Sequence, residues 1–163
     1  MWYTNAEGDN MRLKRKIDEY LREWKKSKNK MPLIVKGARQ IGKTESIKNF
    51  GLNNYKSLIE INFVLQPEYK DIFDKGFEID RVIKDITLKN GDFQFIPGET
   101  LIFFDEIQAN ERALTSLKYF YEEANEYHIA CAGSLLGIRL SHTSFPVGKV
   151  EFMNMYPMTF SEF

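Results

Sequence analysis

Eight consecutive residues follow the pattern G-x-x-x-x-G-K-[ST], one residue after a short apolar run at residues 32–35. Glycines let a backbone wrap closely around a phosphate, and the exposed N–H groups of such a loop and of the helix that follows attract its charge. The lysine is spaced to reach the outer phosphates of a nucleotide, and the hydroxyl after it can ligate Mg²⁺. The pattern predicts a nucleotide-phosphate site formed by Gly37, Ala38, Arg39, Gln40, Ile41, Gly42, Lys43 and Thr44.

Two adjacent carboxylates, Asp105 and Glu106, follow the apolar run at residues 101–104. Phosphoryl chemistry needs a metal held opposite the phosphate loop and a group that orients the attacking water. We expect Asp105 to hold Mg²⁺ through the ligand shell of the ion. We expect Glu106 to act as general base. Two solvated carboxylates at a strand end are the alternative, but their pairing with the upstream octet favours the functional interpretation. A base for water favours a hydrolase over a kinase, because a kinase uses its acceptor hydroxyl.

Further polar residues have two interpretations each. Ser134, after the apolar run at residues 129–132, could hydrogen-bond a γ-phosphate or the attacking water, or could equally cap the next helix. Gln108 could approach the site or simply lead into a helix, and Arg39 could touch phosphate or point to solvent. Arg139 lies where one subunit could donate a positive charge to its neighbour's nucleotide, although surface arginines are common.

The elements that would position these residues alternate between strands and helices, which predicts an α/β fold. We expect a mostly parallel five-stranded sheet with helices on both faces. Unbroken apolar runs indicate central strands, and alternating patterns indicate edge strands. Numbered along the chain, the order 5-1-4-3-2 satisfies this rule for strands at 32–35, 57–63, 101–104, 129–132 and 150–156.

The predicted helices are set by apolar spacing and by stop signals. One begins at Met11 and carries an apolar stripe among Lys and Arg side chains. We favour a docked helix with a solvated basic face over one that contacts nucleic acid or acidic lipid. A second runs from Lys43 to Phe50, with Gly51 as its stop. Residues 1–10 are expected to be a loose tail, and further helices are predicted at 67–74, 79–86 and 110–126.

Composition is that of one globular domain: 163 residues, 43% hydrophobic and 28% charged. Lys+Arg and Asp+Glu both number 23, so no net charge recruits nucleic acid. The single cysteine, Cys131, excludes an internal disulfide and a cysteine-based zinc site. The nearly apolar stretch at residues 129–138 is too short to span a bilayer, and the N-terminus has no apolar leader. We expect a cytoplasmic protein that does not enter a membrane.

Together these motifs resemble the AAA-type P-loop ATPases of bacteria and archaea, in particular a subgroup whose ATPase core is followed by a C-terminal domain of unknown function. The resemblance runs from about Met11 to Phe163. It implies a three-layer P-loop NTPase sandwich, ATP and Mg²⁺ as ligands, and Ser134 as the polar sensor on the fourth strand. The matching segments are residues 37–44, 101–108, 117–120, 132–137, 145–157 and 160–163.

The chain stops at Phe163, where Ser161 and Glu162 look like the start of another helix. We therefore expect an ATPase core at residues 11–163 that lacks the family's helical lid and second sensor arginine. The leading hypothesis is Mg-dependent ATP hydrolysis that drives a conformational change in a downstream domain or partner. The alternative is a nucleotide-dependent switch with little turnover; phosphotransfer to a small molecule is disfavoured. Possible partners are the protein's own C-terminal domain, a second copy as a homo-oligomer, or nucleic acid.

Overall fold

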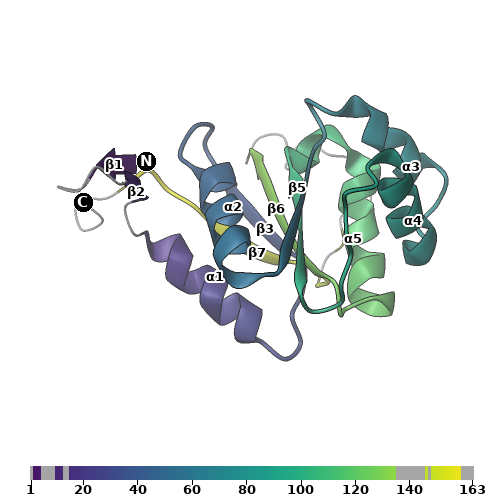
Figure 1. Ribbon diagram of the computed structural model, residues 1–163, viewed down its shortest axis with the longest axis horizontal. Helices are drawn as coiled ribbons and strands as arrows, with labels where there is room; N and C mark the ends of the chain where they lie inside the picture. Colours follow the sequence, from purple (N-terminus) through teal and green to yellow (C-terminus); the bar gives the residue numbers. More distant parts are fainter. Residues whose placement is uncertain (1, 5–9, 13–14, 135–145, 147, 159–163) are drawn as a thin grey trace.

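A five-stranded, all-parallel sheet forms the centre of the computed structural model, which describes residues 2–4, 10–12, 15–134, 146 and 148–158 (Figure 1). The predicted order 5-1-4-3-2 is confirmed, with the two alternating segments at the edges. From one edge to the other the strands are β4 (Ser57–Asn62), β5 (Thr100–Asp105), β6 (His128–Ser134), β3 (Leu33–Gly37) and β7 (Glu151–Asn154).

Helices cover both faces of this sheet, so the molecule has the predicted three layers (Figure 1). Alternate residues of β5 show the division. Leu101 and Phe103 pack with the first two helices, whereas Ile102 and Phe104 pack with the other three. The helices are α1 (Lys16–Lys26) and α2 (Lys43–Asn54) on one face, and α3 (Lys70–Asp74), α4 (Ile79–Lys89) and α5 (Glu111–Glu123) on the other.

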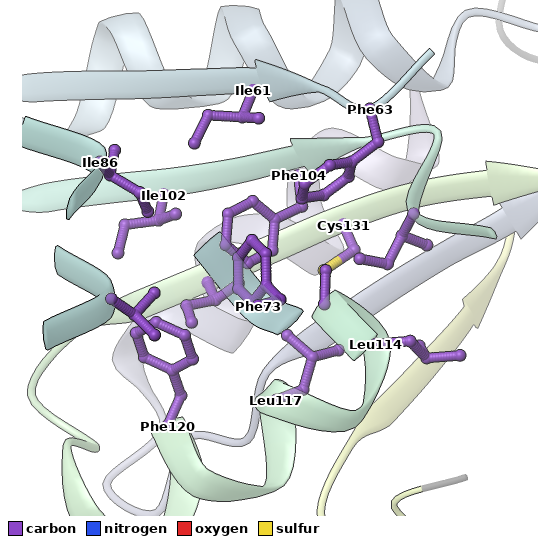
Figure 2. Close-up of a cluster of buried hydrophobic side chains, with 14 of the residues drawn as sticks. Ile61, Phe63, Phe73, Ile86, Ile102, Phe104, Leu114, Leu117, Phe120 and Cys131 are labelled. Carbon is purple, nitrogen blue, oxygen red and sulfur yellow. The ribbon is translucent and has the colours of Figure 1, made fainter. Parts of the chain in front are cut away.

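Aromatic rings meet among aliphatic side chains in the core on the α3–α5 side (Figure 2). Phe104 of β5 lies 5.4 Å from Phe63, 5.9 Å from Phe73 and 6.4 Å from Phe120, measured between ring centroids. All four side chains are buried. Tilted and edge-to-face pairs at these distances add to the stabilisation from burial itself. This cluster fixes β5, and therefore the carboxylates at its end, against α3 and α5.

The first helix begins at Lys16 and not at Met11 as the apolar stripe predicted. Asn10–Arg12 instead forms a short strand, β2, paired antiparallel with β1 (Trp2–Thr4). The helix start is marked by Asp18, whose carboxylate accepts a hydrogen bond from the backbone N–H of Arg15 at 2.7 Å. The division between a tail and a core at residue 10 stays a prediction.

The stripe of α1 docks on the sheet as expected, since Ile17, Leu21 and Trp24 are buried. The second helix was wrongly predicted to stop at Gly51; it runs on to Asn54. Gly51 is buried, and a Cβ there would lie 2.8 Å from Leu58 Cδ1 and 3.1 Å from Leu101 Cδ2. Glycine at this position therefore serves close packing of a helix on the sheet, not helix termination.

The last described helix is shorter than the predicted span of residues 110–126. Asn110 is its N-cap, and its side chain accepts a hydrogen bond from the backbone N–H of Ala113 at 3.1 Å. The chain leaves helical geometry at Ala124. Among the helices that the structure describes, none is long and apolar enough to cross a membrane.

Candidate functional site

The carboxyl ends of β3, β6 and β5 open on one edge of the sheet, as they must in a parallel arrangement. A cavity of about 560 Å³ lies there. It brings together five of the eight loop residues and both predicted carboxylates, while the remaining loop residues, Gly37, Ala38 and Ile41, lie outside its wall. The wall is formed by Arg39, Gln40, Gly42, Lys43, Thr44, Glu45, Val64, Asp105, Glu106, Gln108, Gly133 and Ser134.

The glycine-bounded loop connects β3 directly to α2, so its amides precede a helix N-terminus. Gly42 has φ of 92°, a left-handed conformation that favours glycine, and it is the residue before the first turn of α2. Gly37 is required for a different reason, because a Cβ there would collide with the carbonyl oxygen of Met155. Both glycines of the motif are thus required by the backbone geometry and packing of this fold.

Lys43, the first residue of α2, folds its side chain back over the loop. Its Nζ donates to the carbonyl oxygen of Gly37 at 3.0 Å and to that of Ala38. Partial burial lowers the pKa of Lys43, an effect that the carboxylates of Glu106 and Asp105 oppose and that Arg39 reinforces. The ammonium therefore holds carbonyl oxygens that an anionic phosphate could replace.

Asp105 contacts Thr44 in the cavity wall, although β6 separates β5 from β3. The Thr44 hydroxyl donates to Asp105 Oδ2 at 2.9 Å, and the backbone N–H of Glu106 donates to Oδ1 at 2.9 Å. Burial raises the pKa of Asp105, the hydrogen bonds from Thr44 and Glu106 lower it, and the carboxylates of Glu106 and Glu60 raise it further. Because burial disfavours the negative charge of Asp105, a cation bound beside this carboxylate would be favourable.

The donor set of this pair fits Mg²⁺. Thr44 and Asp105 offer a hydroxyl and a carboxylate oxygen already within 2.9 Å of each other. Mg²⁺ prefers oxygen ligands, and proteins usually bind it through one or two carboxylates while water and substrate phosphates complete its shell. Both residues line the cavity, so water and phosphate oxygens could reach the same place.

Glu106 has an unusual backbone, with φ of 53° and ψ of 46° in the left-handed region. This conformation is uncommon for a residue with a side chain and is often found at functional sites. Its carboxylate Oε2 accepts a hydrogen bond from Gln108 Nε2. Within the described part of the chain, the other amide atom of Gln108, Oε1, is buried without a hydrogen-bond partner. Glu106 is thus turned into the cavity and held by its near neighbour.

Ser134 ends β6 opposite Gly37, its register partner in β3, and lines the cavity. The alternative that it caps the next helix concerns residues outside the described ranges, as does the possible role of Arg139. Arg39 is exposed at the cavity rim, and Gln108 enters the site through its contact with Glu106.

Asn62 and Arg15 lie next to the site and were not identified from the sequence, nor were Glu45 and Val64 of the cavity wall. Asn62 is the register partner of Asp105, and its Nδ2 lies 3.4 Å from Asp105 Oδ2. A polar residue at the end of a strand that neighbours β5 is the signal that could have found it. Arg15 is buried and donates to the carbonyl oxygens of Ile41 and Tyr156. Its place in a run of basic residues gave no signal of this role.

Comparison with known proteins agrees with this geometry. A family model described as an AAA domain matches residues 29–163. No curated protein matches the chain. Among solved structures, a point variant of RuvB from Thermotoga maritima is 15% identical, with a TM-score of 0.50 over 98% of this chain and 48% of that one. PCH-2 of C. elegans is also 15% identical, with a TM-score of 0.49 over 87% of this chain and 42% of that one.

The chain spans less than half the length of either solved protein, and at this identity the likeness to RuvB shows the fold alone. The family match carries more weight than the likeness to solved structures. It extends over most of the chain and includes the phosphate loop, both carboxylates and Ser134. The glycine-bounded loop, the threonine–aspartate pair and the parallel sheet between them are therefore those of a P-loop core, and the chain belongs to the AAA domain family.

Proposed function

We propose that this protein binds ATP and hydrolyses it in the presence of Mg²⁺. The observation that carries the proposal is the hydrogen bond between Thr44 and Asp105 in the wall of a cavity that also contains Lys43, Glu106 and Ser134. These groups come from the start of α2 and from the ends of β5 and β6. A lysine, a pair of hard oxygen donors and a second carboxylate in one cavity match the needs of phosphoryl transfer to water.

Each residue then has a distinct role. The loop amides and Lys43 bind the β- and γ-phosphates, Lys43 leaving the carbonyl oxygens that it holds at rest. Glu106 accepts a proton from the water whose oxygen attacks the γ-phosphorus, and the bridging oxygen leaves with ADP. Ser134 contacts the γ-phosphate or the attacking water. Thr44 and Asp105 hold Mg²⁺, which when bound neutralises the charge on the phosphate oxygens.

We further propose that the nucleotide cycle changes the conformation of a C-terminal domain that follows this core at residues 11–163, in a cytoplasmic protein. The support is the resemblance to the AAA subgroup that carries such a domain. A second copy of the chain is the other candidate partner. Nucleic acid is a weaker candidate, supported by the exposed basic side chains of α1.

The test is Mg-dependent ATP hydrolysis by the full-length protein. Lys43→Ala and Glu106→Gln are each expected to lower the turnover rate by about 100-fold or more. Glu106→Gln should still bind ATP, whereas Lys43→Ala should bind it weakly. Matched controls are Lys84→Ala and Glu111→Gln, both exposed on other helices, which should leave the rate unchanged. Equal rates in the wild type, Lys43→Ala and Glu106→Gln would end the proposal.

One observation favours a second candidate, a nucleotide-dependent switch with little turnover. The Glu106 carboxylate is already engaged by the Gln108 amide, and a base held in this way is slower to accept a proton. Tight ATP binding by the full-length protein without multiple turnover would select the switch. Steady multiple turnover abolished by Glu106→Gln would select the hydrolase.

A further inference from the structure

Arg15 is a charged side chain that the proposed chemistry does not use, and yet it is only 6% exposed. It lies immediately before α1. Its Nη1 donates to the carbonyl oxygen of Ile41, inside the phosphate loop. Its Nη2 donates to the carbonyl oxygen of Tyr156, two residues beyond β7, at 2.8 Å. One guanidinium thus joins two backbone segments that are more than a hundred residues apart in the sequence.

The contact with Ile41 affects the direction in which the polar backbone groups of the loop point. A backbone that cradles an anion must turn N–H groups toward it and carbonyl oxygens away, because a carbonyl dipole pointing at phosphate repels it. Ile41 does not line the cavity, whereas its neighbours Gln40 and Gly42 do. The Ile41 carbonyl is therefore held behind the loop by a cation.

The segment after β7 completes the arrangement. The backbone N–H of Met155 donates to the carbonyl oxygen of Lys36 at 2.8 Å, and the Met155 carbonyl oxygen lies against the α-carbon of Gly37. This segment therefore supports the beginning of the loop directly and its later part through Arg15. Glycine at position 42 also leaves room for the Arg15 side chain, since a Cβ there would lie 3.1 Å from Arg15 Nη1.

We propose that Arg15 is a positioning residue of the phosphate site, which holds the loop in its anion-binding conformation by fastening it to the segment after β7. This inference rests on the proposed nucleotide site. Arginine suits the position because its planar fork donates in two fixed directions while it stays charged. Lysine would keep the charge but could not reproduce both directions of donation.

The test uses the full-length protein and two probes: a fluorescent ATP analogue, and inorganic tripolyphosphate as its competitor, which reports on the phosphate cradle alone. Arg15→Met, which keeps an apolar stem of similar length, is expected to weaken tripolyphosphate binding about tenfold or more, the loss of one charge-assisted hydrogen bond. Arg15→Lys should fall between Arg15→Met and the wild type. Arg22→Met, on the exposed side of α1, is the matched control and should bind like the wild type.

The melting temperature without ligand shows which variants are folded. A folded Arg15→Met variant with wild-type affinity for tripolyphosphate would overturn the inference, as would an equal loss in Arg22→Met. If Arg15→Met does not fold, Arg15→Lys decides: an affinity several-fold below that of the wild type supports the role, and an unchanged affinity refutes it. Failure of the wild type itself to bind the ATP analogue would instead refute the nucleotide site, so the two failures are distinct.

Discussion

Asp105 is a carboxylate in surroundings that disfavour its charge. It is buried at the end of β5, and burial is the main reason why its pKa is raised, with the carboxylates of Glu106 and Glu60 adding to the effect. A carboxyl whose pKa is higher in the folded than in the unfolded protein favours folding while it is protonated. That contribution is lost as the pH rises through the folded-state pKa, so the ionised group weakens the fold above that pKa.

Asp105→Asn should therefore melt at a higher temperature than the wild type at pH 8 when no nucleotide or Mg²⁺ is present. The difference should shrink as the pH is lowered toward about 4, because the wild-type carboxyl then becomes protonated and loses its penalty. Melting curves across this range, with both proteins in the same buffers, measure the effect. A gap that stays constant with pH would contradict it.

At the residue scale, local spacing predicted Lys43, Thr44 and Asp105, because the motifs that carry them lie within single turns or strand ends. Arg15 and Asn62 could not be predicted in the same way. Asn62 meets Asp105 only because β4 and β5 pair in one register. Arg15 meets Ile41 only because α1 docks beside the loop. Contacts of this kind exist only once the elements are assembled.

At the scale of elements, one aromatic cluster ties α1, α2 and β6 together. Trp24 and Tyr55 meet His128 edge to face, with ring centroids 6.2 and 5.5 Å away, and the Tyr55 hydroxyl lies 2.8 Å from His128 Nδ1. Burial, together with the positive charges of Lys30 and Lys25, lowers the pKa of His128 to about 4. The neutral ring is the form that this cluster accommodates.

His128→Phe should reduce the loss of stability on acidification. A histidine with a lowered pKa contributes stability above its unfolded pKa of about 6.5, and this contribution is lost as the pH falls toward the folded value. The wild type should thus lose melting temperature more steeply than the variant between about pH 6.5 and 4. Near pH 8 the variant should be less stable by roughly 1 kcal/mol, since Tyr55 loses its partner. Parallel melting profiles would refute this explanation.

The order of the strands was predictable from the sequence, whereas the ends of the helices were not. Unbroken apolar runs mark strands covered on both faces, and this rule alone placed β3, β5 and β6 inside the sheet. The start of α1 depended on which residues pair as β2, and the end of α2 on how close a helix lies to β5. Both helix ends are decided by packing against other elements, which the type of a single residue does not reveal.

At the scale of the whole molecule, the candidate site joins parts that are otherwise held separately. Lys43 and Thr44 belong to the layer of α2, whereas Asp105 ends a central strand of the sheet and Glu106 follows it. In the described structure one direct hydrogen bond, from Thr44 to Asp105, is recorded between these two pairs of side chains. A ligand held by both sides would add contacts that the unfolded chain lacks.

Mg-ATP should therefore raise the melting temperature of the full-length protein in a concentration-dependent way. A ligand that binds only the folded state stabilises it by about 2.7 kcal/mol at a hundred times its dissociation constant. Lys43→Ala should lose most of this shift, and Asp105→Asn should lose the part that depends on Mg²⁺. Thermal melts over a series of Mg-ATP concentrations provide the measurement. Identical shifts in the wild type and Lys43→Ala would argue against binding at this cavity.

Gly51 lies near the opposite end of α2 from the phosphate loop, eight residues after Lys43 and so about 12 Å along the axis. An added methyl group there would lie 2.8 Å from the end of the Leu58 side chain and 3.1 Å from that of Leu101, so both leucines would have to shift. Where the leucines do not give way fully, the far end of α2 moves instead, and because α2 is one continuous helix the amides at its start move with it. A position that touches no ligand is thus coupled to the site through the helix, and a larger residue there would disturb anion binding.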